Sequence, residues 1–177
     1  MLKTDTSEKG LESLIVAALP GQDADGGPQS DGVVDKPAIP YGKLVYVQGD
    51  PSHYDRDHAV DLDKLLAFLR VTQPRVVEQL AIDADGPKRR EFLARLQGQV
   101  TARGVVDVLH NGIKHGPASV DLFYGTPSPG NIQAAQRYAA NVFSVTRQLR
   151  YSNDESSLAM DLCLFIDGLP VATLELQ

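Results

Sequence analysis

The sequence predicts helices followed by a mostly antiparallel or mixed β-sheet, in an α/β or α+β fold. Apolar residues recur at helical spacing up to about residue 103, and β-branched runs with period-two alternation follow. The pair Asp167-Gly168 between the last two apolar runs is a strong signal for a β-hairpin. With 177 residues, 42% of them hydrophobic, the chain can bury one good core, so we expect a single domain over residues 1–177.

The N-terminal segment is expected to begin with a helix at residues 7–19. Apolar residues at positions 11, 14, 15, 18 and 19 form one stripe, and Pro20-Gly21 ends it. Residues 21–42 are rich in Gly, Asp and Pro and lack periodicity, so we expect a poorly ordered loop there. A short strand at residues 44–47 follows.

Three further helices are predicted before residue 105. Leucines at positions 62, 65, 66 and 69 repeat at helical spacing, and Thr72-Gln73-Pro74 interrupts the pattern. A second short helix is expected at about residues 76–80. The third begins at Pro87, a residue favoured in a first helical turn, and ends at Arg103 before Gly104.

The remainder of the chain is predicted to supply most of the sheet. Residues 105–109 and 120–124 are β-rich runs separated by glycines, and we expect them to be neighbouring strands. A short helix is predicted at residues 131–138. Residues 143–151 alternate apolar and polar, as a strand with one solvent-facing side does. The last two strands, at residues 158–166 and 169–176, flank the hairpin turn.

Composition excludes several classes of protein. The single cysteine, Cys163, rules out a disulfide framework and a cysteine-based zinc pattern. The sequence has neither a secretion signal nor 18 consecutive apolar residues, so we expect a cytoplasmic protein without membrane contact. The net charge of −6 argues against a simple basic nucleic-acid binder. Residues 64–150, however, hold 12 basic and 6 acidic residues, which favours either a phosphate-facing surface or an ordinary solvated helix face.

Two carboxylates lie at matching positions of the predicted C-terminal hairpin. Paired residue numbers in a tight hairpin turning at 167–168 sum to 335, or to 336 with a three-residue loop, and Asp161 and Glu175 sum to 336. They are therefore directly opposite or offset by one step, and a divalent cation with oxygen ligands would relieve their repulsion. Taken singly, each residue is better explained without a metal: Asp161 as a strand-entry residue hydrogen-bonded to a loop, and Glu175 as a solvent-facing residue on an alternating strand.

The segment from Asp161 to Gln177 resembles the PD-(D/E)xK core of the restriction-endonuclease-like superfamily, in the form typical of type I restriction enzyme R subunits. Residues 54–57, the leucine-rich helix leading into Thr72-Gln73-Pro74, and the opening helix at residues 8–19 look like the same family. The resemblance implies a restriction-endonuclease-like mixed sheet flanked by helices. It also implies that the chain is C-terminally truncated relative to a larger R subunit.

The resemblance further implies a site and a reaction. Asp161 and Glu175 would bind Mg²⁺ with help from the Leu176 carbonyl, and Glu12, or less favourably Glu8, would approach from the first helix. The reaction would be hydrolysis of phosphodiester bonds in double-stranded DNA, as in a type I site-specific deoxyribonuclease. The partners would be the modification and specificity subunits. ATP would bind only in motor domains beyond this chain, because no phosphate-binding G-x-x-x-x-G-K-[ST] loop occurs here.

One departure from the family pattern leaves a second interpretation open. The lysine of the motif falls at Gln177, whose amide cannot supply the positive charge that stabilises a developing anion. The alternative is therefore a cleavage-deficient nuclease fold that serves as a docking or DNA-binding module. Other polar residues carry weaker signals: His53 to His58 is predicted to form a solvated turn, His110 and His115 to be loop residues, and residues 136–138 to be a surface helix face or a phosphate contact.

Overall fold

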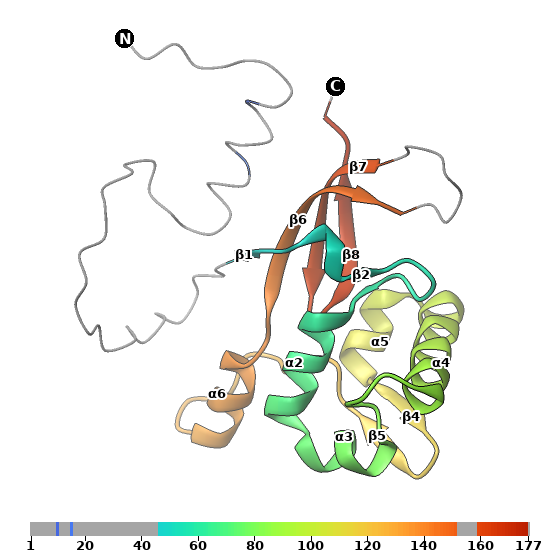
Figure 1. Ribbon diagram of the computed structural model, residues 1–177. Helices are drawn as coiled ribbons and strands as arrows, with labels where there is room; N and C mark the ends of the chain where they lie inside the picture. Colours follow the sequence, from blue (N-terminus) through green and yellow to red (C-terminus); the bar gives the residue numbers. More distant parts are fainter. Residues whose placement is uncertain (1–9, 11–14, 16–45, 152–158, 177) are drawn as a thin grey trace, which may run out of the picture.

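The computed structural model describes residues 10, 15, 46–151 and 159–176. Within these residues it shows a mixed α/β domain with five α-helices and a mixed sheet (Figure 1). The strands are β1 (Tyr46–Gln48), β2 (Tyr54–Asp55), β3 (Val60–Asp61), β4 (Ile113–His115), β5 (Ala118–Val120), β6 (Phe143–Arg150), β7 (Ala159–Ile166) and β8 (Leu169–Leu174). The helices are α2 (Leu62–Thr72), α3 (Pro74–Leu80), α4 (Pro87–Arg103), α5 (Val105–Asn111) and α6 (Ile132–Ala139), and a 3-10 turn, η1, lies at Pro51–His53.

The predicted loop at residues 21–42 and most of the predicted first helix lie outside the described residues. Gly10 and Ile15 are described and helical, in agreement with the prediction for residues 7–19. Ile15 packs against the buried side chains of Val145 and Leu162. The one described side chain of that segment thus contacts the principal sheet.

The principal sheet has the strand order β1-β6-β7-β8 and is mixed, as predicted. β1 runs parallel to β6, whereas β6, β7 and β8 pair antiparallel. In the turn between β7 and β8, Asp167 and Gly168 have φ values of 50° and 83°. A two-residue hairpin turn of this kind requires positive φ at both positions, which explains why Asp-Gly marks it. The predicted C-terminal hairpin is confirmed.

The helices before residue 105 form largely where the sequence predicts them. Both ends of α4 match, and Gly104 follows it with a φ of 84°. Asp61 caps α2, because its Oδ1 accepts a hydrogen bond from the Lys64 amide at 3.1 Å. α3 begins at Pro74 rather than near residue 76, since proline has no amide hydrogen to leave unpaired in a first turn.

The prediction of a strand at residues 105–109 is wrong, because this segment is helix α5. Val108 and Leu109 are buried and Val106 is exposed, a spacing that suits a helix packed on one side. Asp107 accepts a hydrogen bond from Arg103 at 2.5 Å and one from Asn111 at 2.7 Å, which links consecutive helical turns. Tertiary packing against α4 and β8 therefore overrides the β preference of the valines.

The strand predicted at residues 120–124 is also misplaced, since β5 ends at Val120. Beyond Val120, side-chain amides take the place of a neighbouring strand. The Asp121 amide donates to Gln73 Oε1 at 2.9 Å, and Gln73 Nε2 donates to the Asp121 carbonyl at 2.7 Å. Asn141 does the same for Tyr124 at 3.0 and 2.7 Å. The hairpin that does form is β4–β5, with Ile113 opposite Val120.

The prediction that β6 has one solvent-facing side is wrong for its first half. Ser144 and Thr146 are as buried as Val145 between them. η1 and the chain beside it cover the polar side, and a Cβ on Gly49 would collide with the Thr146 hydroxyl. Neither hydroxyl has a hydrogen-bond partner among the described residues.

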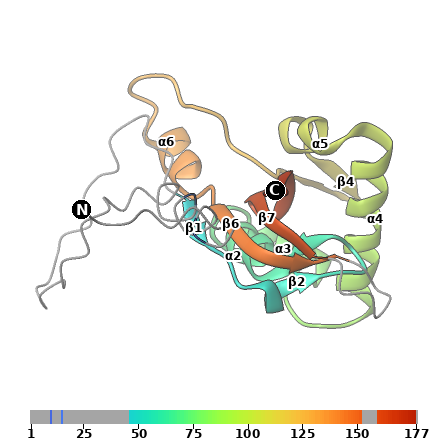
Figure 2. The same cartoon turned by 90° about the horizontal axis from the view of Figure 1, so that it is seen from above.

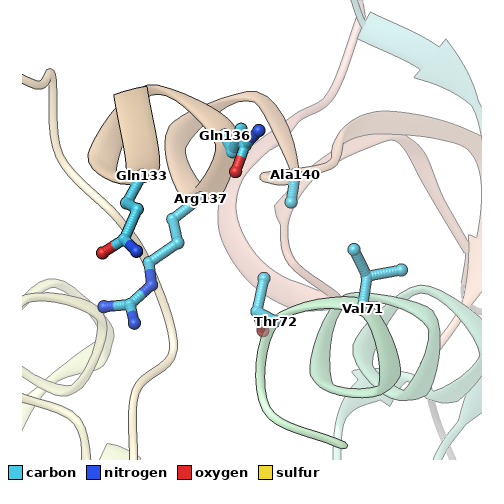
Figure 3. Close-up of a pocket in the computed structure, with 6 residues that line it drawn as sticks. All are labelled: Val71, Thr72, Gln133, Gln136, Arg137 and Ala140. Carbon is cyan, nitrogen blue, oxygen red and sulfur yellow. The ribbon is translucent and has the colours of Figure 1, made fainter. Parts of the chain in front are cut away.

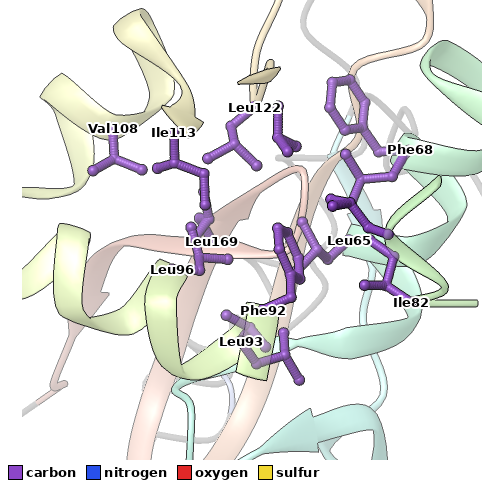
Figure 4. Packing of buried hydrophobic residues seen from close by; sticks show 14 of the residues in the cluster. Leu65, Phe68, Ile82, Phe92, Leu93, Leu96, Val108, Ile113, Leu122 and Leu169 are labelled. Atoms are coloured by element: carbon purple, nitrogen blue, oxygen red, sulfur yellow. The ribbon is translucent and has the colours of Figure 1, made fainter. Parts of the chain in front are cut away.

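The main hydrophobic core lies among the helices rather than on the face of the sheet (Figure 4). It joins α2, α3, α4, α5 and the β4–β5 hairpin, and Leu169 beside the β7–β8 turn belongs to it. Smaller clusters cover the two faces of the sheet, one around Val145 and Leu162 and the other around Cys163 and Phe165. α6 lies on the opposite side of the domain from α4 and α5 (Figures 1 and 2). The start of β7 lies at the end of the sheet away from α2, α3, α4 and α5 (Figure 1).

The tip of the β7–β8 hairpin is held by the start of α2. The Asp61 amide donates to the Gly168 carbonyl at 2.8 Å. The Asp167 amide donates to the Val142 carbonyl at 2.8 Å, and the Val142 amide donates back to Asp167 Oδ1 at 2.6 Å. Asp167 is fully buried, and its Oδ2 has no partner among the described residues. Burial raises the pKa of Asp167 to about 7.

Replacing Asp167 by asparagine is expected to change how stability depends on pH. Between the unfolded pKa of 3.8 and the folded pKa of about 7, the wild-type fold keeps a proton that the unfolded chain releases. The free energy of unfolding therefore falls as pH rises through this window, by up to about 1.4 kcal/mol per unit. Asparagine accepts from Val142, tolerates positive φ and has no proton to lose, so the variant should be about 2 kcal/mol more stable at pH 8.

The measurement is urea unfolding of both proteins from pH 5 to pH 8. Asp61, which is buried and whose pKa is also raised by burial, is present in both and cancels in the comparison. A difference between the two proteins that stays constant with pH would contradict the prediction.

Candidate metal site

The pairing of β7 with β8 ends at Leu162 and Leu174, and Asp161 and Glu175 are the next residues on the two chains. Next to the turn, Phe165 pairs with Pro170, and an irregularity between Leu164 and Phe165 then shifts the pairing by one residue. Leu162 pairs with Leu174 beyond that shift, so one further residue along the two chains brings Asp161 to Glu175. Directly opposite residues have Cβ atoms about 5 Å apart. Of the two pairings predicted from the sequence, the direct one fits this register.

Asp161 is the third residue of β7, an inner strand of the sheet, and it is half-buried. Its Oδ2 accepts a hydrogen bond from the backbone amide of Leu176 at 2.7 Å. Its Oδ1 accepts one from the side-chain amide of Gln148, on β6, at 3.2 Å. Glu175 is exposed. Asp161 is therefore held by neutral donors from both neighbouring strands.

The two carboxylates fit a divalent cation in their donor chemistry. Within the described part of the chain, neither Asp161 nor Glu175 forms a salt bridge with a basic side chain. Two adjacent carboxylates without a basic partner leave uncompensated negative charge, and carboxylate oxygens are the ligands that Mg²⁺ prefers. Among the described residues, no group of three or more His, Cys, Asp or Glu side chains is close enough to hold a metal. The two described carboxylates therefore do not by themselves make up such a group.

Four other residues were predicted to take part in the site, namely Glu12, Glu8, Gln177 and Leu176. Glu12 and Glu8, and the lysine-position residue Gln177, lie outside the described residues. Leu176 is described, and it contacts Asp161 through its amide; the predicted role of its carbonyl stays a prediction. Leu176, Leu174 and Ile15 pack against the cluster of Val145 and Leu162 on one face of the sheet.

A polar hollow of about 430 Å³ lies between the end of α2 and α6 (Figure 3). Its lining residues are Val71, Thr72, Gln133, Gln136, Arg137 and Ala140. The Arg137 guanidinium lies 5.6 Å from the centre of the Tyr124 ring and forms no salt bridge with the described carboxylates. A stacked, unpaired guanidinium of this kind can contact a phosphate group. The surface-helix and phosphate-contact interpretations of residues 136–138 both remain open.

Among the described residues, the histidines belong to no cluster of three or more His, Cys, Asp or Glu side chains that could hold a metal ion. His58 Nδ1 lies 3.0 Å from Asp55 Oδ2 within the turn between β2 and β3, as expected for a local polar turn. The prediction of His110 and His115 as loop residues is wrong, because His110 belongs to α5 and His115 to β4. The His115 ring packs edge-on against Phe92, with the ring centres 5.7 Å apart. It is a packing residue.

The family match covers the C-terminal part of the chain and contains the two carboxylates. Residues 106–177 match the family model described as the type I restriction enzyme R protein N terminus (HSDR_N). The match covers 72 of the 177 residues, and it shows that this region is similar to the N terminus of type I restriction enzyme R proteins. No curated protein and no solved structure gives a significant match to the chain. The resemblance seen in the sequence is confirmed for this R-protein region, while residues 8–19, residues 54–57 and the leucine-rich helix α2 lie outside the match.

One residue of the R-protein region was missed by reasoning from the sequence. The alternation of β6 places Gln148 among the solvent-facing residues, and nothing in that pattern connects it with Asp161. Its backbone has a φ of 48°, which is unusual for a residue other than glycine within a strand. The feature that distinguishes Gln148 is therefore its backbone conformation, which the residue types do not predict. Among the described residues, no helix is long and apolar enough to cross a membrane.

Proposed function

We propose that this chain is the Mg²⁺-dependent endonuclease region of a type I restriction enzyme R subunit, which hydrolyses phosphodiester bonds of double-stranded DNA. The observation that carries the proposal is the Asp161 carboxylate, held opposite Glu175 without a basic partner among the described residues. The match of residues 106–177 to the R protein family supports it. The mixed sheet flanked by helices is compatible with a restriction-endonuclease-like fold, which is part of the proposal.

Each residue of the site has a proposed role. Asp161 and Glu175 supply carboxylate oxygens on one side of the sheet, with the Leu176 carbonyl and Glu12 as further ligands. Bound Mg²⁺ would neutralise charge on the scissile phosphate and lower the pKa of the attacking water. The hydrogen bonds from Gln148 and Leu176 keep the Asp161 carboxylate in one orientation before any ligand binds.

Gln177 supplies the argument for a second function. A neutral amide can orient water but cannot replace the positive charge of a lysine near a developing anion. A cleavage-deficient module that docks the R subunit on the modification and specificity subunits is therefore the competing proposal. In either case ATP hydrolysis would belong to motor domains outside this chain.

The charge of the described residues supports DNA as the substrate. Residues 64–150 carry 12 basic and 6 acidic residues, all within the described range. Arg137 is available for a phosphate, and β6 begins just after α6 at Phe143 and leads to Gln148 beside Asp161, about 16 Å along the strand. Contacts with phosphates rather than base edges would leave recognition of the sequence to a separate subunit.

The experiment that separates the two functions is plasmid cleavage by the full-length protein, assembled with its modification and specificity subunits, in Mg²⁺ and in Mn²⁺. Gln177→Lys is expected to raise the cleavage rate by about 10- to 100-fold, because it adds a positive charge beside the reacting phosphate. A variant without the Asp161 carboxylate defines the background. Cleavage by neither the wild type nor Gln177→Lys would overturn the nuclease proposal and favour the docking module.

A further inference from the structure

The Asp161 carboxylate receives one N–H donor on each oxygen. Gln148 Nε2 donates to Oδ1 at 3.2 Å, and the Leu176 amide donates to Oδ2 at 2.7 Å. The donors come from the two sides of β7, one from β6 and one from the chain that continues β8 (Figure 1). Because one donor holds each oxygen, the carboxylate cannot rotate without losing a hydrogen bond. Its remaining lone pairs therefore keep a constant direction.

The backbone at Gln148 departs from a regular strand. Its φ of 48° lies in the left-handed region, which glycine and asparagine adopt readily and glutamine adopts at a cost in free energy. The pairing of β6 with β7 is regular on both sides, with Arg147 opposite Leu162 and Leu149 opposite Met160. The left-handed backbone thus occurs at the residue of β6 between these two pairs, and Asp161 is the residue of β7 between them.

The distortion changes which side chains of β6 face each side of the sheet. In a regular strand, Val145 and Leu149 would point to the same face, because side chains alternate with a period of two. Instead Val145 packs with Leu162, whereas Leu149 is buried with Cys163 and Phe165 on the other face. Gln148 itself is exposed and bonded to Asp161. The strained residue therefore both buries Leu149 and presents an amide to the carboxylate.

We propose that Gln148 is a positioning residue, which orients the Asp161 carboxylate for a divalent cation through a neutral hydrogen bond. This inference rests on the proposed function, because it assumes that Asp161 binds the cation. A neutral donor suits this task, since an arginine or lysine at the same place would compensate the negative charge and compete with the metal ion. Partners that orient a metal ligand typically change metal affinity by about 10- to 100-fold when removed.

Gln148→Gly separates positioning from folding. Glycine adopts the left-handed conformation without strain, so the thermal midpoint in the absence of metal should stay the same or rise. The hydrogen bond to Asp161 is lost, so the affinity for Mn²⁺ should fall by about 10- to 100-fold. Ala59→Gly is the matched control: Ala59 has a similar φ of 56°, and the same relief of strain there should leave Mn²⁺ affinity unchanged.

The measurements are Mn²⁺ titration of the whole chain, followed by electron paramagnetic resonance, and thermal unfolding without metal. Lower Mn²⁺ affinity in Gln148→Gly, with unchanged stability and an unaffected Ala59→Gly control, is the expected result. If Asp161→Asn loses Mn²⁺ binding while Gln148→Gly keeps it, the positioning role is wrong and the proposed function stands. If the wild type binds no Mn²⁺, or Asp161→Asn binds it as the wild type does, both are overturned. A loss of stability in Gln148→Gly that accompanies the lower affinity would assign Gln148 a structural role instead.

Discussion

Asp161→Asn is expected to reduce DNA cleavage by the full-length protein by about 1000-fold or more. Metal ions contribute several kcal/mol of transition-state stabilisation, and each 1.36 kcal/mol corresponds to a tenfold change in rate. Asparagine removes the charge but preserves the local structure. Its oxygen can still accept from the Leu176 amide, and its NH₂ group can donate to the Gln148 oxygen once that amide turns over. The loss therefore reports on the metal ligand rather than on the fold.

The same variant has an effect that needs no DNA. A ligand that binds the folded state raises stability in proportion to the logarithm of its concentration above the dissociation constant. Mn²⁺ should therefore raise the thermal midpoint of the wild type and not that of Asp161→Asn. Asp85→Asn, on an exposed turn before α4, changes the net charge equally and serves as the control. Equal Mn²⁺ stabilisation of Asp161→Asn and the wild type would show that Asp161 is not a ligand.

Gly168→Ala is expected to destabilise the fold by about 3–5 kcal/mol, a large part of the stability of an ordinary domain. A Cβ at this position would lie 2.5 Å from the Asp61 carbonyl oxygen, 2.6 Å from the Leu65 nitrogen and 2.7 Å from the Leu65 Cβ. Two of these are backbone atoms at the start of α2, which cannot move without breaking the contact between the hairpin tip and the helix. The positive φ of 83° adds backbone strain.

Gly130→Ala is the matched control for the steric part of this effect. Gly130 has nearly the same φ, 84°, but a Cβ there has no heavy atom within 4 Å. It should cost only about 1 kcal/mol, the usual penalty for alanine in the left-handed region. Urea unfolding of the three proteins measures the difference. Similar losses in both variants would mean that strain, and not the contact with α2, explains the requirement for glycine at position 168.

Local sequence signals were sufficient to predict a helix or a hairpin where that element is determined by residues close together in the chain. The ends of α4 follow from Pro87 and Gly104, and the last hairpin follows from Asp167-Gly168, because proline restricts φ and glycine permits positive φ wherever they occur. They failed for residues 105–109. There the buried positions of Val108 and Leu109 decide the structure, and burial depends on α4 and β8 rather than on the local sequence.

The candidate site was only partly predictable. The carboxylates of Asp161 and Glu175 could be placed on one hairpin from their numbers alone, but two pairings were open. The irregularity between Leu164 and Phe165 selects one of them, and such an irregularity depends on how the two strands pack. The alternation of β6 correctly predicts that Gln148 is exposed, but it does not predict the hydrogen bond to Asp161 or the left-handed backbone at Gln148.

The sequence by itself therefore determined the α/β class, the helices with clear terminal residues, the hairpin that carries Asp161, and the resemblance to the R proteins. These depend on backbone preferences and on spacing along the chain, which are local properties. Only the tertiary structure decided that residues 105–111 are helical, that Ser144 and Thr146 are buried, and that Asp161 is held between β6 and the continuation of β8. Each of these depends on contacts between distant segments, whose free energy exceeds the small differences in local preference.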